Sequence, residues 1–173
     1  FYPYQIFAGS QDQGLQKSIT NNEEIQDFEQ IISGDYGHLV SGNDGIGIWT
    51  NYPGFTIYYP DIANSNASMS LDFPGSGYLW IAPLMEHPEF PNKAILGGGG
   101  INGGNHLIEL SLSLQGNQIT FNENEYNFSS TISAMGYSPI DPSHRYVLTE
   151  NGKFYYSSNN GENWNMNLSF TGP

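Results

Sequence analysis

Hydrophobic residues along this chain gather in short runs, and turn-forming residues separate the runs. β-branched or aromatic residues dominate most runs, and Gly, Pro, Asn or Asp stands at their ends, which is the pattern of short β-strands. The pattern predicts strands at 4–9, 28–32, 38–40, 47–49, 55–59, 78–82, 94–96, 107–114, 118–121, 131–137, 145–149 and 153–156. Residues 21–30 carry acidic side chains after a polar cap, but Ile25 and Phe28 are their only apolar residues. A helical turn or a loop is therefore expected there.

A turn phrase, Ser-x-[Asp/Asn]-x-Gly, occurs three times, at 10–14, 41–45 and 157–161. The residues that define the first and last phrases are Ser10, Asp12 and Gly14, and Ser157, Asn159 and Gly161, the last followed by Trp164. Such a turn forms because a short polar side chain bonds its own backbone, Gly takes a positive φ, and the Trp buries against the next sheet. The last phrase matches Ser/Thr-x-Asp-x-Gly-x-x-Trp, with Asn159 in the Asp position. Both phrases are expected to be structural turns.

Two longer phrases, 82–97 and 135–147, read as a strand, a turn bracketed by prolines, and a second strand. Pro fixes φ and cannot donate to a ladder, so it ends one strand and presets the turn before the next. Together with the Ser-x-[Asp/Asn]-x-Gly turns, these phrases resemble the Asp-box (BNR-like) and sortilin-like β-propeller repeat proteins, in which the proline phrase joins the first and second strands of a blade. The segments 7–14 and 33–37 are also similar to phrases of that family. The resemblance covers most of the chain and implies an all-β fold of Asp-box blades in a secreted bacterial protein.

The chain length limits the number of blades. At about 45 residues per blade, 173 residues hold three to four blades, whereas closed propellers usually have four to eight. Open blade edges would expose unpaired strands. We therefore expect residues 1–173 to form a single, partial β-propeller domain that is a fragment of a longer chain. The expected partners are the remaining blades, supplied by the same propeller or by an associated protein.

The charge balance excludes several classes of partner. Seventeen acidic residues face four Lys and Arg, which gives a formal net charge of −13. Nucleic acid and anionic membranes need basic patches, so neither is an expected partner. The absence of Cys removes disulfides, thiol nucleophiles and thiolate metal sites. Many Asn, Ser, Gly and Tyr with few Lys indicate an extracellular bacterial protein, with the cell surface as an alternative location.

Catalytic chemistry has little support in the sequence. Glycoside hydrolysis uses two carboxylates, and the resemblance to propeller hydrolases of plant or algal polysaccharide makes Asp12 the nearest counterpart of one; its partner acid would lie outside this chain. Sialidases hold the substrate carboxylate with three arginines, whereas this chain has only Arg145. The Gly-rich segment 97–104 is followed by no Lys-Ser/Thr, so it is not a phosphate-binding loop.

Metal and ligand sites are equally weakly indicated. The four histidines are scattered without the spacing of a zinc site. The segments 41–45 and 102–105 are rich in oxygen ligands suited to Ca²⁺, but plain turn chemistry explains them as well. Aromatic residues offer a sugar- or peptide-binding face, and core packing is the alternative for them. The aromatic candidates are Trp49, Tyr52, Tyr59 and Trp80.

The leading hypothesis is a non-catalytic, extracellular β-propeller segment that serves ligand binding, adhesion or scaffolding. Its ligand would be a carbohydrate or a peptide, and no cofactor is expected. The alternative is part of a propeller glycoside hydrolase.

Overall fold

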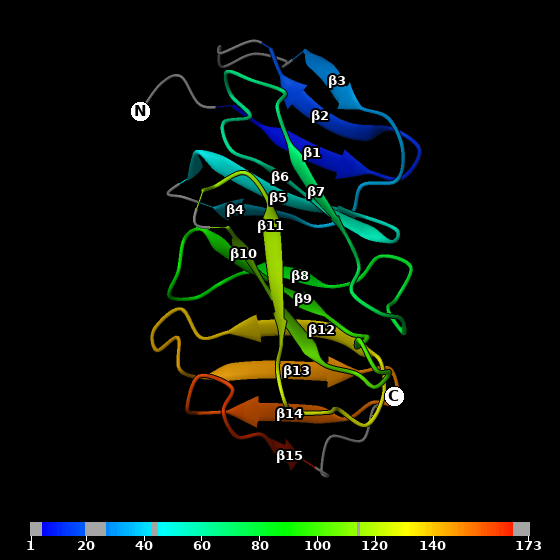
Figure 1. Ribbon diagram of the computed structural model, residues 1–173, viewed down its shortest axis with the longest axis vertical. Helices are drawn as coiled ribbons and strands as arrows, with labels where there is room; N and C mark the ends of the chain where they lie inside the picture. Colours follow the sequence, from blue (N-terminus) through cyan, green and yellow to red (C-terminus); the bar gives the residue numbers. More distant parts are fainter. Residues whose placement is uncertain (1–4, 20–26, 43–44, 114, 168–173) are drawn as a thin grey trace.

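A computed structural model describes residues 5–19, 27–42, 45–113 and 115–167, and these form four antiparallel sheets that follow one another along the long axis (Figure 1). Sheet 1 contains β1 (Phe7–Ser10), β2 (Gly14–Ser18) and β3 (Phe28–Ile32). Sheet 2 contains β4 (Leu39–Gly42), β5 (Gly47–Tyr52), β6 (Phe55–Tyr59) and β7 (Met69–Asp72). Sheet 3 contains β8 (Leu84–Glu86), β9 (Lys93–Gly97), β10 (Leu107–Leu112) and β11 (Ile119–Glu123). Sheet 4 contains β12 (Ile132–Tyr137), β13 (Arg145–Thr149), β14 (Phe154–Ser157) and β15 (Asn165–Asn167).

The sheets have the arrangement of propeller blades. Each strand pairs with the next one along the chain, so every sheet is a simple meander. The first strands of sheets 2, 3 and 4 contact one another, since β4 touches β8 and β8 touches β12, while the last strands β7 and β11 meet at the opposite edge. The predicted all-β fold of blade-like sheets is confirmed. The described residues contain no helix that is long and apolar enough to cross a membrane.

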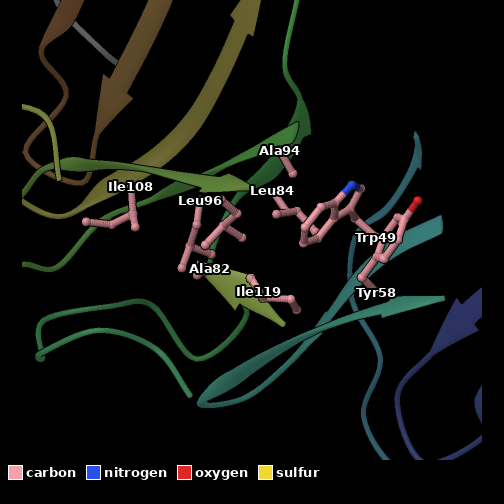
Figure 2. Packing of buried hydrophobic residues seen from close by; sticks show 9 residues of the cluster. Trp49, Tyr58, Ala82, Leu84, Ala94, Leu96, Ile108 and Ile119 are labelled. Atoms are coloured by element: carbon pink, nitrogen blue, oxygen red, sulfur yellow. The ribbon is translucent and has the colours of Figure 1, made fainter. Parts of the chain in front are cut away.

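Apolar side chains fill the space between successive sheets. Between sheets 2 and 3, the rings of Trp49 and Tyr58 lie 4.5 Å apart and pack with Leu84 and Leu96 (Figure 2). Neighbouring residues of β9 point to opposite sides, so Leu96 faces sheet 2 while Ile95 belongs to the cluster shared with sheet 4. Each such buried side chain stabilises the fold by about 1.5–3 kcal/mol. Sheet 3 is thus apolar on both faces.

The proline phrases lie where the sequence places them. The phrase 82–97 contains β8 and β9, and the phrase 135–147 joins β12 to β13, so both connect the first and second strands of their sheets. The predicted strand at 78–82 is wrong. This segment lies in the connection from β7 to β8, where the Tyr78 hydroxyl donates to the Pro74 carbonyl at 2.7 Å and its ring packs on Phe73. Of the predicted helical turn at 21–30, residues 21–26 lie outside the described part and residues 28–30 belong to β3.

The two turns predicted to be alike occupy different hairpins. The turn after Ser157 joins the third and fourth strands of sheet 4, whereas Ser10 and Gly14 pair with each other between β1 and β2. The amide of Gly14 donates to the carbonyl of Gly34, just after β3, at 2.8 Å. In sheet 2 the equivalent bond, from Phe73 N to Gly54 O at 2.8 Å, ties the end of the fourth strand to the turn between the second and third. The β1–β2 turn of sheet 1 therefore corresponds to the turn between the second and third strands of sheet 2. The turn at 10–14 and the turn at 157–161 thus occupy different positions in their sheets, although the sequence phrases are alike.

Candidate functional site

The turn between β14 and β15 is held by its own side chains. The Ser157 hydroxyl accepts hydrogen bonds from the amides of Asn159 at 3.2 Å and Gly161 at 2.9 Å. It donates to Asn159 Oδ1 at 3.0 Å, and that oxygen also accepts from the amide of Asn163 at 3.1 Å. Gly161 has a φ of 84°, a region that favours glycine. These bonds fix the position of residues 160–162.

Trp164 anchors this turn to the core. Its side chain is 9% exposed, and its ring lies 5.2 Å from that of Phe128 and 6.3 Å from that of Tyr126. Phe128 also meets Tyr155 edge to face at 5.1 Å. Aromatic pairs of this kind add about 0.5–1.5 kcal/mol each to the burial itself. The turn is therefore rigidly attached to the interface between sheets 3 and 4.

A pocket opens beside this turn, between sheets 3 and 4, and has a volume of about 390 Å³. We call it the Arg145 pocket. Side chains from both sheets, from the segment after β11 and from the Ser157 turn form it, with apolar residues next to amides and carboxylates. The lining residues are Ile95, Leu107, Glu109, Asn122, Asn124, Glu125, Tyr126, Arg145, Asn160, Gly161 and Glu162.

Two buried polar atoms of this pocket have no hydrogen-bond partner among the described residues. They are the donor Nε of Arg145 and the acceptor Oδ1 of Asn124. Arg145 is 8% exposed, and its Nη2 lies 3.9 Å from Glu89 Oε2. Burial lowers the pKa of Arg145, and Glu89 and Glu109 oppose this shift. A buried polar atom without a partner is costly. Protein atoms cover both atoms, so a ligand contacts them only after their side chains turn toward the pocket.

A charged network adjoins the pocket on the sheet 3 side. Glu109 Oε1 lies 2.7 Å from Lys93 Nζ, and Glu109 Oε2 lies 3.3 Å from His87 Nε2. His87 Nδ1 accepts from the amides of Glu89 and Phe90, at 3.1 and 3.2 Å, so the proton of the neutral ring sits on Nε2, on the side of Glu109. Burial, reinforced by Arg145, lowers the pKa of His87. The network orients the Glu109 carboxylate at the pocket wall.

The predicted aromatic binding residues lie elsewhere. Trp49 is 0% and Tyr59 2% exposed, which corrects the prediction that they line a binding face, because both rings fill the core. Tyr52 is half-buried and stacks on Phe55 at 5.0 Å. Trp80 is 56% exposed in the connection from β7 to β8. None of the four lines the Arg145 pocket.

The weak catalytic candidate Asp12 also lies apart from the pocket. It is exposed in the β1–β2 turn, where it has a φ of 63° and its amide donates to Asp35 Oδ1 at 2.9 Å. Ser10 and Gly14 flank it in the same turn. The carboxylate beside Asp12 is that of Asp35, and neither of these two residues lines the Arg145 pocket.

The structure describes one of the two candidate calcium segments in full and the other in part. Residues 43 and 44 of the segment 41–45 lie outside the described part of the chain. In the segment 102–105, the Asn105 amide donates to Asn127 Oδ1 and the Asn105 side chain donates to the Phe128 carbonyl. Across the described ranges, no group of three or more His, Asp or Glu side chains is placed to hold a metal ion.

The Arg145 pocket could not be found by sequence motifs, because its residues come from segments between 95 and 162 that meet only when two sheets pack. One signal was present. Arg145 is the single arginine of a chain with a net charge of −13, and it stands at an inward position of a strand. Charged side chains are rarely buried unless they are paired, so an arginine at an inward strand position indicates a polar site beside that strand.

Comparison with known proteins supports the fold and leaves the function open. No protein-family model and no curated protein matches the sequence. Among solved structures, the chain is similar to a protein from Bacteroides fragilis described as a candidate 6-phosphogluconolactonase, with a TM-score of 0.58 and 9% sequence identity. The similarity covers 87% of this chain and 49% of that one, so this chain spans about half of the neighbour's length. The neighbour has a β-propeller-like fold, in agreement with the blade-like sheets.

Proposed function

We propose that this chain is a non-catalytic part of a β-propeller that binds a neutral carbohydrate in the Arg145 pocket. The single observation that carries the proposal is the pair of buried atoms without partners, Arg145 Nε and Asn124 Oδ1, in one pocket. One is a donor and the other an acceptor. A sugar hydroxyl both accepts and donates, so hydroxyls of a bound sugar pair with both atoms once the two side chains turn toward the pocket.

The remaining lining residues suit the same ligand. Glu125 and Glu162 provide acceptors for further hydroxyls, Asn122 provides an amide, and Tyr126 provides an aromatic wall for the apolar face of a sugar ring. Ile95 and Leu107 add apolar surface. A volume of about 390 Å³ lies in the range of small-molecule sites.

Charge argues against anionic ligands. Three carboxylates line the pocket, those of Glu109, Glu125 and Glu162, against the one guanidinium of Arg145. The net charge of −13 repels phosphate, sulfate and sialic acid as well. The neutral sugars are therefore favoured over the acidic ones.

The hydrolase alternative is not proposed, because Asp12 is an exposed turn residue remote from the pocket lining. An extracellular setting remains part of the proposal and rests on the composition of the chain. Adhesion and scaffolding are the biological uses to which such carbohydrate binding is suited.

The test is a glycan array followed by calorimetry on the purified chain and two pocket variants. Arg145→Lys keeps the charge but removes the Nε donor, and a lost hydrogen bond to a charged group lowers affinity by about 10-fold or more. Asn124→Ala removes the neutral acceptor and is expected to lower it by about 3- to 10-fold. Asn102→Ala, in the exposed loop after β9, is the matched control and leaves affinity unchanged.

Three outcomes contradict the proposal. They are the absence of any neutral glycan among the array hits, a preference for sialylated or sulfated glycans, and full affinity in both pocket variants. Circular dichroism of each variant separates a lost contact from a lost fold.

A further inference from the structure

The connections between the first and second strands of sheets 3 and 4 share one hydrogen-bond framework. In each, the amide of the first residue donates to the carbonyl of the last, from His87 to Lys93 at 3.0 Å and from Ser138 to His144 at 2.9 Å. Proline stands at the second and fifth positions of both connections. We call them the His87 turn and the Ser138 turn. The chain thus builds the same turn twice, on neighbouring sheets.

The two turns differ in the atom that caps them. His87 Nδ1 accepts hydrogen bonds from the amides of Glu89 and Phe90, at 3.1 and 3.2 Å. Ser138 Oγ accepts from the amides at the matching positions of its own turn, both at 3.3 Å. An imidazole nitrogen therefore does in sheet 3 what a hydroxyl oxygen does in sheet 4.

Only the imidazole acceptor is lost on acidification. A hydroxyl oxygen keeps its lone pairs as the pH falls, whereas both ring nitrogens of a protonated histidine are donors. Protonated His87 would point an N–H group at two backbone N–H groups and leave both without an acceptor. A buried donor without an acceptor is costly. The protonated ring therefore favours an open His87 turn, and the Ser138 turn has no such dependence.

The charged groups that face His87 nearly balance one another. Burial has the largest effect and lowers the pKa of His87, and Arg145 of β13 and Lys93 of β9 lower it further. Glu109 of β10 and Glu89 of the turn itself act in the opposite direction. Because the pKa of His87 lies below the ordinary 6.5, the ring is neutral and the cap is in place at neutral pH.

Solvent reaches the His87 turn through a pocket. His87 is 7% exposed and lines a pocket of about 490 Å³ to which sheets 2, 3 and 4 all contribute. β8 and β12 supply Glu86 and Tyr137, and the Tyr137 hydroxyl donates to Glu86 Oε1. The described residues of sheet 2 in the lining carry no titratable group. Water in this pocket can deliver a proton to His87 and can solvate the amides that lose their acceptor.

The His87 turn also carries a partner of the single arginine of the chain. Glu89 Oε2 lies 3.9 Å from Arg145 Nη2. The Phe90 ring lies 4.9 Å from the His87 ring, and Lys93 Nζ lies 4.7 Å from the Phe90 centroid. Glu89 and Phe90 are both exposed, so the turn can open toward solvent while the strands on either side stay paired.

We infer that the His87 turn is a proton-operated switch: when His87 gains a proton, the turn opens and Glu89 leaves Arg145, while the Ser138 turn stays closed. Protonation of histidine is a general means of switching conformation near neutral pH. The switch acts on a turn and an ion pair, so it stands whether or not the Arg145 pocket binds a sugar.

Hydrogen exchange followed by NMR tests the switch in the 173-residue chain. The pH is lowered from about 8 until the His87 ring signals show that the ring is protonated. After correction for the intrinsic pH dependence of exchange, the protection of the Glu89 and Phe90 amides is expected to fall by about 5-fold or more, because each loses a hydrogen bond. The amides of Ile140 and Asp141 in the Ser138 turn are expected to keep their protection. Strand amides of β9 and β10 show that the core stays folded.

Two variants separate the cap from the ion pair. His87→Asn is the matched control, because an asparagine Oδ1 caps turn amides in the same way and does not titrate; protection at positions 89 and 90 is expected to be independent of pH in it. The Arg145 Nε–H signal reports the ion pair. It is expected to differ between the native chain and Glu89→Gln at about pH 8 and to coincide once His87 is protonated, since Glu89 has then left Arg145.

Four results overturn the inference. The first is unchanged protection of the Glu89 and Phe90 amides when His87 is protonated, and the second is the same loss of protection in His87→Asn. The third is protonation of His87 only as the whole chain unfolds. The fourth is an Arg145 signal that still differs from that of Glu89→Gln after His87 is protonated, because Glu89 then keeps its contact.

Discussion

Replacing Ser157 by Ala tests the turn that carries one side of the Arg145 pocket. The hydroxyl is 1% exposed and makes three hydrogen bonds, two accepted from the amides of Asn159 and Gly161 and one donated to Asn159 Oδ1. Each is worth about 1 kcal/mol net, and water replaces part of what is lost in this half-buried turn. We expect Ser157→Ala to lower the free energy of unfolding by about 2–3 kcal/mol.

Urea denaturation followed by tryptophan fluorescence measures this loss, because Trp164 packs directly behind the turn. The midpoint is expected to fall by about 1 M or more. Ser157→Thr keeps the hydroxyl and is expected to retain most of the stability, while the exposed Ser158→Ala changes it by less than about 0.5 kcal/mol. If Ser157→Ala is as stable as Ser158→Ala, the turn is not held by the Ser157 hydroxyl and the reasoning fails.

Three further predictions concern packing, backbone and pH. Trp164→Ala is expected to cost about 3–5 kcal/mol in urea denaturation, against little for Trp80→Ala, which removes a ring that is 56% exposed. Gly14→Ala and Gly116→Ala both force a positive φ, 75° and 68°, onto alanine, at about 1–2 kcal/mol. Gly14→Ala is expected to cost clearly more in thermal unfolding, because its Cβ would lie 1.9 Å from a backbone oxygen while that of Gly116 meets nothing. Burial lowers the pKa of His87 below its ordinary 6.5, so on acidification the unfolded chain is protonated at His87 before the folded chain is. The contribution of neutral His87 to stability is therefore lost as the pH falls below about 6.5. An NMR titration that finds a raised pKa for His87 would contradict this prediction.

Much of the fold follows from local pattern. The runs at 55–59 and 145–149 combine β-branched or aromatic residues with turn residues at both ends, and both are strands with the predicted bounds. The proline phrases predicted which strands are neighbours, because proline ends a ladder wherever it stands. The pattern missed three strands, β2, β7 and β15, because polar residues weaken their hydrophobic signal.

The candidate site follows far less from local pattern. Trp49 was a reasonable binding candidate because aromatic residues surround it in the sequence. Strand alternation predicts which face of a sheet a side chain is on. It does not predict whether another sheet covers that face. Asn124 follows β11 and carries no motif, and its exposure to a pocket depends on how sheet 4 packs on sheet 3. Sites formed between sheets are set by long-range packing, which a local pattern does not encode.

The most direct test of the carbohydrate proposal uses the single arginine of the chain. Because only Arg145 contributes an arginine Nε–H, its signal in a nitrogen–proton correlation spectrum is unambiguous, and its Nε has no partner in the structure's described residues. Titration with the best-binding neutral glycan is expected to shift this signal in step with calorimetric saturation. A glycan that saturates the protein while the Arg145 Nε–H signal stays in place would contradict the account.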